Sequence, residues 1–338
     1  MNGTATDTGS PPARTEPAGT PTKAAESVAS PPLRSRVRRG TASFWLNTLF
    51  FLSEHWPLLS RAIRRISLVV GWQFSKVFRS GPVLNARHLL GPDSTLKERE
   101  ACAFATIESF YISVYELGRA LRCSREELQK QVDVVDGHER YHRIRASRRG
   151  AIIVTAHLGP FELGVAALVP YERKIHVVYQ RDANARFDRL RSRLRRHLGI
   201  AEAPVDDGLA TWARLRDALL RDEVIMLQGD RVMPGQTGVR VPFLDGHILM
   251  PTGPVKLAMI TGAPIIPVFS IRERIGKVRV MIEEPIEVEQ EPGSVRGDHP
   301  AMVALASVIA RHVRAHPTQW HMMYPVWCED IDEAAAKT

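Results

Sequence analysis

The stretch AIIVTAHLGPFELGVAAL, residues 151–168, indicates how the second half of the chain folds. Its first six residues are apolar or β-branched, as in a strand that is buried on both faces of a parallel sheet. Pro160 suits the first turn of a helix, and Gly159 permits a tight entry into that turn. We therefore expect a central strand over 151–156 that leads directly into a helix over 160–169.

His157 and Glu162 lie on either side of this junction. His157 falls at the carboxyl end of the strand, where open α/β sheets form their ligand crevice. Two residues five apart on one continuous helix point about 140° away from each other, so the pair can converge only if His157 precedes the helix. Glu162 would then accept a hydrogen bond from one ring nitrogen and leave the other free as a base. The alternative is a structural histidine, with a glutamate that complements the helix dipole.

The sequence beyond this stretch alternates between strand and helix patterns. Further strands are expected at 175–180, 223–228, 239–243, 264–271 and 277–288, the last of them antiparallel. Further helices are expected at 184–198, 208–221, 252–262 and 299–315. This alternation predicts an α/β fold with a mixed, mostly parallel central sheet flanked by helices.

Three segments precede this α/β domain, which we place at 150–330. Residues 1–40, rich in Pro, Ala, Thr, Gly and Ser, predict a disordered tail that ends in a basic cluster. Residues 41–80 are hydrophobic, but their longest uncharged run is shorter than the ~20 residues of a membrane span. Their aromatic residues and arginines predict a helix in the membrane interface; the alternative is a helix packed on the main domain. Residues 81–149 predict a helical region, with a helix over 95–122 and a capping box from Ser124 to Glu127.

The composition favours anionic partners without choosing among them. The chain has 338 residues, a formal net charge of +9 and a pI of about 9.8, which suits nucleic acid, an acidic carrier protein or an anionic membrane surface. The arginine-rich helix over 184–198 has the same three interpretations, beside that of an ordinary solvated helix. We find no recognisable nucleic-acid module and expect no nucleic-acid binding. Three scattered cysteines predict neither zinc nor a disulfide framework, and fit a reducing, cytoplasmic setting.

Four blocks in order resemble the bacterial lipid A late acyltransferases and their relatives, including the mycobacterial phosphatidylinositol mannoside acyltransferases. The first is HLGPFE, a His-x4-Asp/Glu pattern, and the second is VVYQRDANARFDRLRSRLRRHLGI. The third and fourth are MLQGDRVMPGQTGVRVPFLDG and PTGPVKLAMITGAPIIPVF. The resemblance covers roughly residues 85–327 and implies a glycerolipid acyltransferase-like fold.

The resemblance also implies an activity. A membrane-associated acyltransferase of this kind moves a fatty acyl chain from acyl carrier protein or coenzyme A to a hydroxyl of a glycolipid or lysolipid. His157 would remove the acceptor proton with Glu162 as its partner, and backbone N–H groups near Gly159 would stabilise the oxyanion. The motif contains no serine or cysteine nucleophile, so we expect direct transfer, with no metal and no cofactor. The expected location is the cytoplasmic face of a cell inner membrane, peripheral or anchored by the N-terminal segment.

Five further residues are candidates for substrate binding. Arg181 follows one predicted strand and would bind a phosphate, or else pair with a neighbouring aspartate. Asp230 ends another strand and would support His157, position Arg231 or simply form a turn. Phe243 and the helix that begins near Gly253 would wall an acyl channel, or else form ordinary core.

Departures from the family pattern leave the acceptor lipid open. Pro160-Phe161 replaces a polar-aromatic pair, Asp245 is inserted into the FLDG segment, and Arg231 stands where the lipid A enzymes have glutamine. We expect a lipid A precursor as acceptor, with a lysophospholipid or a mannoside lipid as the alternative. A non-catalytic lipid-binding membrane protein is the alternative of another class.

Overall fold

The computed structural model describes residues 26–27, 48, 51–52, 55–74, 76–182, 184–232, 236–290 and 293–336. The tail predicted for 1–40 lies outside these residues, apart from Glu26–Ser27, which form β1 and pair antiparallel with β7 (Thr237–Phe243). Part of the hydrophobic segment predicted for 41–80 also lies outside them.

A seven-stranded sheet forms the centre of the fold and confirms the predicted mixed, mostly parallel architecture. Its order is β2-β10-β9-β3-β6-β4-β5, and only the β9–β10 pair is antiparallel. The strands are β2 (Val132–Asp136), β10 (Lys277–Ile282), β9 (Ile265–Arg274), β3 (Ala151–Thr155), β6 (Val224–Gln228), β4 (Ile175–Tyr179) and β5 (Ala201–Pro204). Every residue of β3 is buried, as its apolar sequence predicts. The strand expected at 277–288 ends at Ile282.

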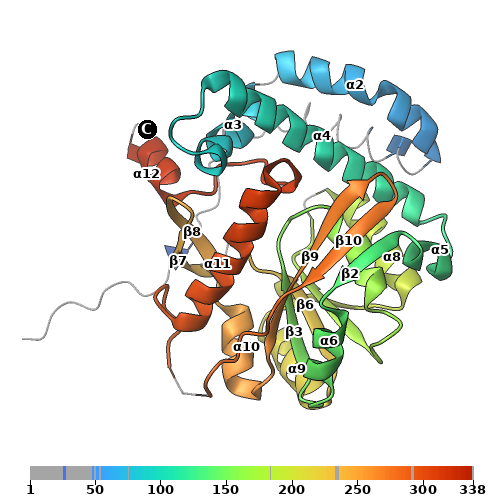
Figure 1. Ribbon diagram of the computed structural model, residues 1–338, viewed down its shortest axis with the longest axis vertical. Coiled ribbons are helices and arrows are strands. Elements are labelled where there is room, and N and C mark those ends of the chain that lie inside the picture. Colours follow the sequence, from blue (N-terminus) through green and yellow to red (C-terminus); the bar gives the residue numbers. More distant parts are fainter. Residues whose placement is uncertain are drawn as a thin grey trace, which may run out of the picture.

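Helices cover both faces of this sheet and enclose two apolar cores (Figure 1). One face carries α9 (Leu209–Leu220), α10 (Gly253–Thr261) and α11 (Pro300–Ala315), together with the hairpin of β7 and β8 (Gly246–Pro251). The other face carries α6 (His138–Arg145), α7 (Phe161–Gly164) and α8 (Ala185–Leu198). The C-terminal helix α12 (Cys328–Ala336) lies against β8.

The N-terminal helices pack along one edge of this domain. They are α2 (Pro57–Phe74), α3 (Lys76–Leu90), α4 (Leu96–Ala120) and α5 (Arg125–Gln129). The predicted capping box at Ser124 is confirmed, and Thr95 caps α4 in the same way. Figure 1 shows α2 along the outer side of α4, where Leu68 packs against Ile107 and Tyr111.

The junction after β3 is tighter than the sequence suggests. The helix expected over 160–169 is a single turn, α7, followed by a 3-10 turn over Val165–Ala167. Gly159 has a φ of +58°, and a Cβ atom there would lie 2.1 Å from the backbone oxygen of Ser270 on β9. The absence of a side chain at Gly159 therefore allows the chain to turn directly against the sheet.

We expect Gly159→Ala to destabilise the protein by on the order of 3 kcal/mol, because it adds a backbone clash to the cost of a positive φ. Gly91→Ala is the matched control: φ there is +93°, but nothing lies within 4 Å of the added Cβ. Its cost should be about 1 kcal/mol. Urea unfolding measures both free energies, and equal losses would contradict the close approach.

Candidate active site

His157 lies directly beyond β3, and Asp230 lies directly beyond the neighbouring parallel strand β6. The register pairs Thr155 with Gln228, so the residues two positions further along each strand fall side by side. The His157 ring donates from Nδ1 to Asp230 Oδ1 at 2.8 Å, and the His157 backbone N–H donates to Asp230 Oδ2 at 2.8 Å. Of the roles foreseen for Asp230, support of His157 is therefore the one that the geometry favours.

Asp230 is a fully buried carboxylate that is held by three hydrogen bonds. The third donor is the indole Nε1 of Trp320, 2.9 Å from Oδ2. Burial alone favours a higher pKa for Asp230, but the charge and hydrogen bonds of His157, with the bond from Trp320, hold this pKa below its usual value. Asp230 is therefore ionised at neutral pH and can stabilise a positive charge on the imidazole.

His157 is neutral at neutral pH. Burial, together with the charges of Arg231 and Arg191, lowers its pKa from 6.5 to about 4, although Asp230 pulls in the opposite direction. Because Asp230 accepts the proton on Nδ1, the lone pair of the neutral ring is on Nε2. His157 thus presents an unprotonated nitrogen that is available as a base.

The structure does not form the expected hydrogen bond between His157 and Glu162. Glu162 Oε1 pairs instead with Arg191 Nε of α8 at 2.7 Å, and Asp230 holds the imidazole. The physical reason is that α7 faces α8, whereas the strand register places Asp230 at His157. Phe161, not Glu162, contacts the imidazole, as an edge-to-face ring 5.9 Å away.

Two arginines of α8 turn inward. Arg195 is buried, pairs with Glu202 at 3.1 Å, and stacks over the Tyr179 ring. Arg191 is mostly buried against Glu162. This part of α8 is therefore not a solvated surface, whereas Arg193 and Arg196 border an open hollow at its far end.

Arg181 and Arg231 follow the carboxyl ends of strands, as predicted. Arg181 is half-exposed and pairs with Asp206 and Asp207, rather than with Asp182 or Asp188, which follow it in sequence. Arg231 donates to the Tyr324 hydroxyl at 2.9 Å, and its charge acts on His157. Of the two, Arg231 is the cation that belongs to the His157 site.

Phe243 and Gly253 belong to closely packed regions. Phe243 is buried between the rings of Trp320 and Trp327, at centroid distances of 5.8 and 6.0 Å. A Cβ atom on Gly253 would lie 2.8 Å from the Trp212 ring. Neither residue lines the cavity described next.

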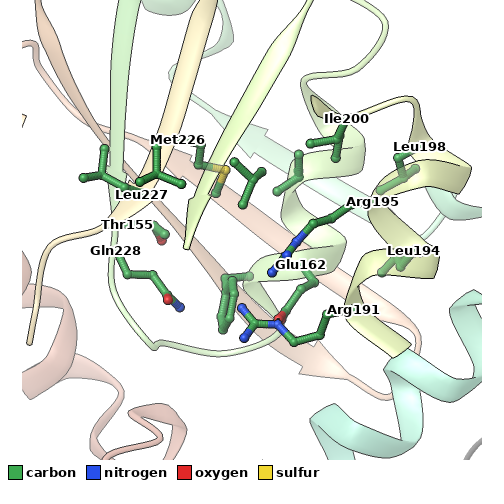
Figure 2. Close-up of a pocket in the computed structure, with 14 residues that line it drawn as sticks. Thr155, Glu162, Arg191, Leu194, Arg195, Leu198, Ile200, Met226, Leu227 and Gln228 are labelled. Atoms are coloured by element: carbon green, nitrogen blue, oxygen red, sulfur yellow. The ribbon is translucent and has the colours of Figure 1, made fainter. Parts of the chain in front are cut away.

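A cavity of about 30 Å³ lies between the sheet and the α7–α8 side of the molecule (Figure 2). Thr155, Gln228 and the Glu162–Arg191 pair border it, and these residues adjoin the His157–Asp230 pair in sequence or space. The rest of its wall is mainly apolar: Val165, Val177, Leu194, Leu198, Ile200 and Met226. The cavity thus lies across the sheet from the region of Phe243 and α10.

The segment 319–324 was missed by the sequence analysis and closes the site from the C-terminal side. The His321 backbone N–H donates to the His157 carbonyl at 2.8 Å, and Gly159 N–H donates to Gln319 O at 2.9 Å. His321 is buried, which lowers its pKa to about 3, and its Nε2 contacts Ser109 Oγ at 3.1 Å. The concentration of aromatic and histidine residues in WHMMY was the available signal.

Within the described residues, no group of three or more His, Cys, Asp or Glu side chains is arranged to hold a metal ion. None of the helices in these ranges combines the length and hydropathy needed to cross a membrane.

Comparison with known proteins identifies the family. Residues 39–329 match the family described as bacterial lipid A biosynthesis acyltransferase. The phosphatidylinositol mannoside acyltransferase of Mycobacterium tuberculosis is 28% identical over 74% of this chain and 77% of its own length. The protein of that name in Mycolicibacterium smegmatis is 29% identical over 68% and 71%. The lipid A biosynthesis lauroyltransferase of Escherichia coli is 26% identical over 58% and 62%. The chain therefore belongs to the bacterial lipid A biosynthesis acyltransferase family, and the protein is an acyltransferase.

Proposed function

We propose that the protein transfers a fatty acyl group from a thioester, of acyl carrier protein or coenzyme A, to a sugar hydroxyl of a membrane glycolipid. The observation that carries this proposal is the buried His157–Asp230 pair at the carboxyl edge of the central strand. A neutral imidazole backed by a buried carboxylate suits the removal of a proton from an alcohol.

The reaction proceeds in one transfer through a tetrahedral intermediate. His157 Nε2 takes the proton of the acceptor hydroxyl while its oxygen attacks the thioester carbonyl carbon. The C–O bond forms, the C–S bond breaks, and the leaving thiolate takes the proton back from the imidazolium. The thioester supplies the activated acyl group, so we propose no metal and no further cofactor.

Arg231 is our candidate for stabilising the oxyanion. The backbone N–H groups of His157 and Gly159 already donate to Asp230 and Gln319, which argues against the role expected for this turn. The Arg231 guanidinium acts on His157 and is a preorganised positive charge at the site. Glu162 holds Arg191 at the wall of the cavity, where its charge also acts on the His157 ring.

The acceptor is proposed at the level that the relatives share. Their names divide between phosphatidylinositol mannoside and lipid A, and both are lipids that present sugar hydroxyls. We therefore propose a lipid A precursor or a mannoside lipid as acceptor, with a lysophospholipid as the remaining alternative.

Membrane contact is proposed to occur through α2. Leu58, Leu59, Ile66, Val69 and Val70 are exposed, with Leu58 76% and Ile66 69% accessible. At 100° per residue these five side chains span about 120° of the helix circumference. This apolar stripe suits a helix that lies in the interface of the cytoplasmic leaflet of the inner membrane, with the protein bound peripherally.

A radiolabelled acyl donor, presented as acyl carrier protein or coenzyme A thioester with purified candidate lipids, tests the activity. We expect wild type to label a glycolipid and His157→Ala to lower the rate by roughly 100-fold or more. His247→Ala, which changes a half-exposed histidine paired with Glu329, should leave the rate unchanged. If wild type uses no donor while it still binds lipid, the non-catalytic alternative holds instead.

The pH dependence of the same assay tests the base. Because only neutral His157 accepts a proton, the rate should stay level as the pH is lowered through 6.5 and fall only as it approaches 4. A midpoint near 6.5 would show that His157 does not have the depressed pKa on which this expectation rests.

The cavity beside α8 is our candidate for the end of the acyl chain, because its wall is mainly apolar. Its volume of about 30 Å³ is room for roughly two water molecules, so the surrounding side chains must move apart to admit more of the chain. In Figure 2, Leu198 and Ile200 lie away from Thr155 and Gln228, so Leu198 is placed to limit the depth of the chain. Leu198→Phe should lower the rate ratio of long to short acyl donors by about 10-fold. Leu190→Phe makes the same change in a buried residue of α8 that does not line the cavity, and the ratio should stay constant. Equal rate ratios in the two variants would exclude the cavity as the site of the acyl chain.

The stripe on α2 is tested by vesicle sedimentation. The triple variant Leu58→Ser, Ile66→Ser and Val69→Ser should bind anionic vesicles at least roughly 100-fold more weakly, because three inserted apolar side chains are lost. The control triple variant Leu209→Ser, Leu220→Ser and Ile260→Ser removes exposed apolar residues from α9 and α10. Similar binding by the two variants would contradict a membrane role for α2.

A further inference from the structure

The indole N–H of Trp320 donates to the carboxylate of the site. The side chain is 1% exposed, and its Nε1 donates to the same oxygen of Asp230, Oδ2, that accepts the His157 backbone N–H. These two donors occupy Oδ2 and direct Oδ1 to the His157 ring. Two fixed hydrogen bonds to one oxygen define how the carboxylate is rotated.

We propose that Trp320 is a positioning residue of the acyl transfer, and that its indole N–H sets the orientation and basicity of the His157–Asp230 pair. This inference rests on the proposed function. It adds that the base is controlled from the C-terminal segment 319–324, which lies outside the His-x4-Glu motif.

The surroundings of Trp320 give its N–H a fixed direction. The ring packs against Phe243 and meets Trp327 edge-to-face at 5.7 Å. Trp327 in turn stacks on His88, and His88 is held on both ring nitrogens by Asp245 and Asp330. Packing by Phe243 and Trp327 restricts how the indole ring can turn, so its N–H is preorganised toward Asp230.

The N–H also affects the basicity of the Asp230 carboxylate. A hydrogen bond to Oδ2 stabilises the carboxylate and weakens its attraction for a proton on His157. Without this bond, Asp230 becomes more basic and holds the imidazolium more strongly. Both changes raise the pH at which the pair takes up a proton.

Several other charged or titratable groups face the pair, and the experiment leaves all of them in place. Arg231 and Arg191 act on His157 from the β6–β7 segment and α8. His157 in turn acts on His321 of the C-terminal segment. Tyr324 faces Asp230 and bonds Arg231. A change confined to the indole N–H therefore isolates one influence on His157 among these.

Trp327 is the matched control. It is fully buried in the same aromatic cluster, and its Nε1 has no hydrogen-bond partner among the described residues. Trp320→Phe and Trp327→Phe remove the same ring area from the same region. Only Trp320→Phe removes a hydrogen bond to Asp230.

The experiment measures kcat/KM for acyl transfer against pH in the full chain, with thermal unfolding of each variant. We expect Trp320→Phe to lower kcat/KM by roughly 10-fold or more, as for other hydrogen bonds to a charged group. Its acid limb should move to higher pH by about half a unit or more. Trp327→Phe should keep the wild-type acid limb. The proposal would be overturned if both variants lost kcat/KM equally with unshifted acid limbs. It would also be overturned if Trp320→Phe lost no kcat/KM.

Replacement of Trp320 by benzothienylalanine keeps the two-ring shape and exchanges N–H for sulfur, so it serves if the phenylalanine variant is unstable. It should reproduce the shifted acid limb, and a wild-type profile in this variant also overturns the proposal. His157→Ala separates this inference from the proposed function: an active His157→Ala contradicts the function itself. An inactive His157→Ala beside an unaffected Trp320 variant contradicts only the role of Trp320.

Discussion

The in-register parallel pairing of β3 with β6 is the constraint on which the site depends. Both strands are buried, and the pairing of Thr155 with Gln228 fixes what lies side by side beyond their carboxyl ends. His157 and Asp230 are 73 residues apart in sequence, yet they meet with two hydrogen bonds. The register of the sheet therefore determines the partner of His157, and the local spacing of HLGPFE does not.

The same burial explains why the charges at the site are so closely matched. A carboxylate that is shielded from water needs hydrogen-bond donors from the protein. Asp230 has three such donors: the backbone N–H and ring Nδ1 of His157, and the indole N–H of Trp320. Burial and the neighbouring arginines keep His157 neutral in the resting protein. A proton accepted by His157 therefore creates the charge opposite an anion that is already oriented, with no need for reorganisation.

Local patterns in the sequence predicted most of the central sheet but not the contacts of the site. The buried run of β3 and the capping box at Ser124 depend on neighbouring residues, and both were predictable. Strands β2 and β5 were missed because VDVVD and AEAP are short and only partly buried. Strand β8, GHILMP, was also missed, although its burial partly alternates. The Glu162–Arg191 pair and the Trp320–Asp230 hydrogen bond were missed, because these contacts join segments far apart in the chain. An arginine is normally expected at the surface, so the burial of Arg195 against the Tyr179 ring was not predictable from the sequence.

The helix α2 is tied to the catalytic sheet through α4. Tyr111 of α4 donates to the Ser60 backbone oxygen of α2 at 3.0 Å, and Arg64 pairs with Glu108. On its inner side, α4 binds Arg272 of β9 through Glu116 and Ser109, and β9 is a direct neighbour of β3. With α2 seated in the bilayer surface as proposed, this stack sets the height of His157 above the lipid. An acceptor must then raise its reactive hydroxyl to that height, which makes the length of the headgroup a criterion for selecting substrates.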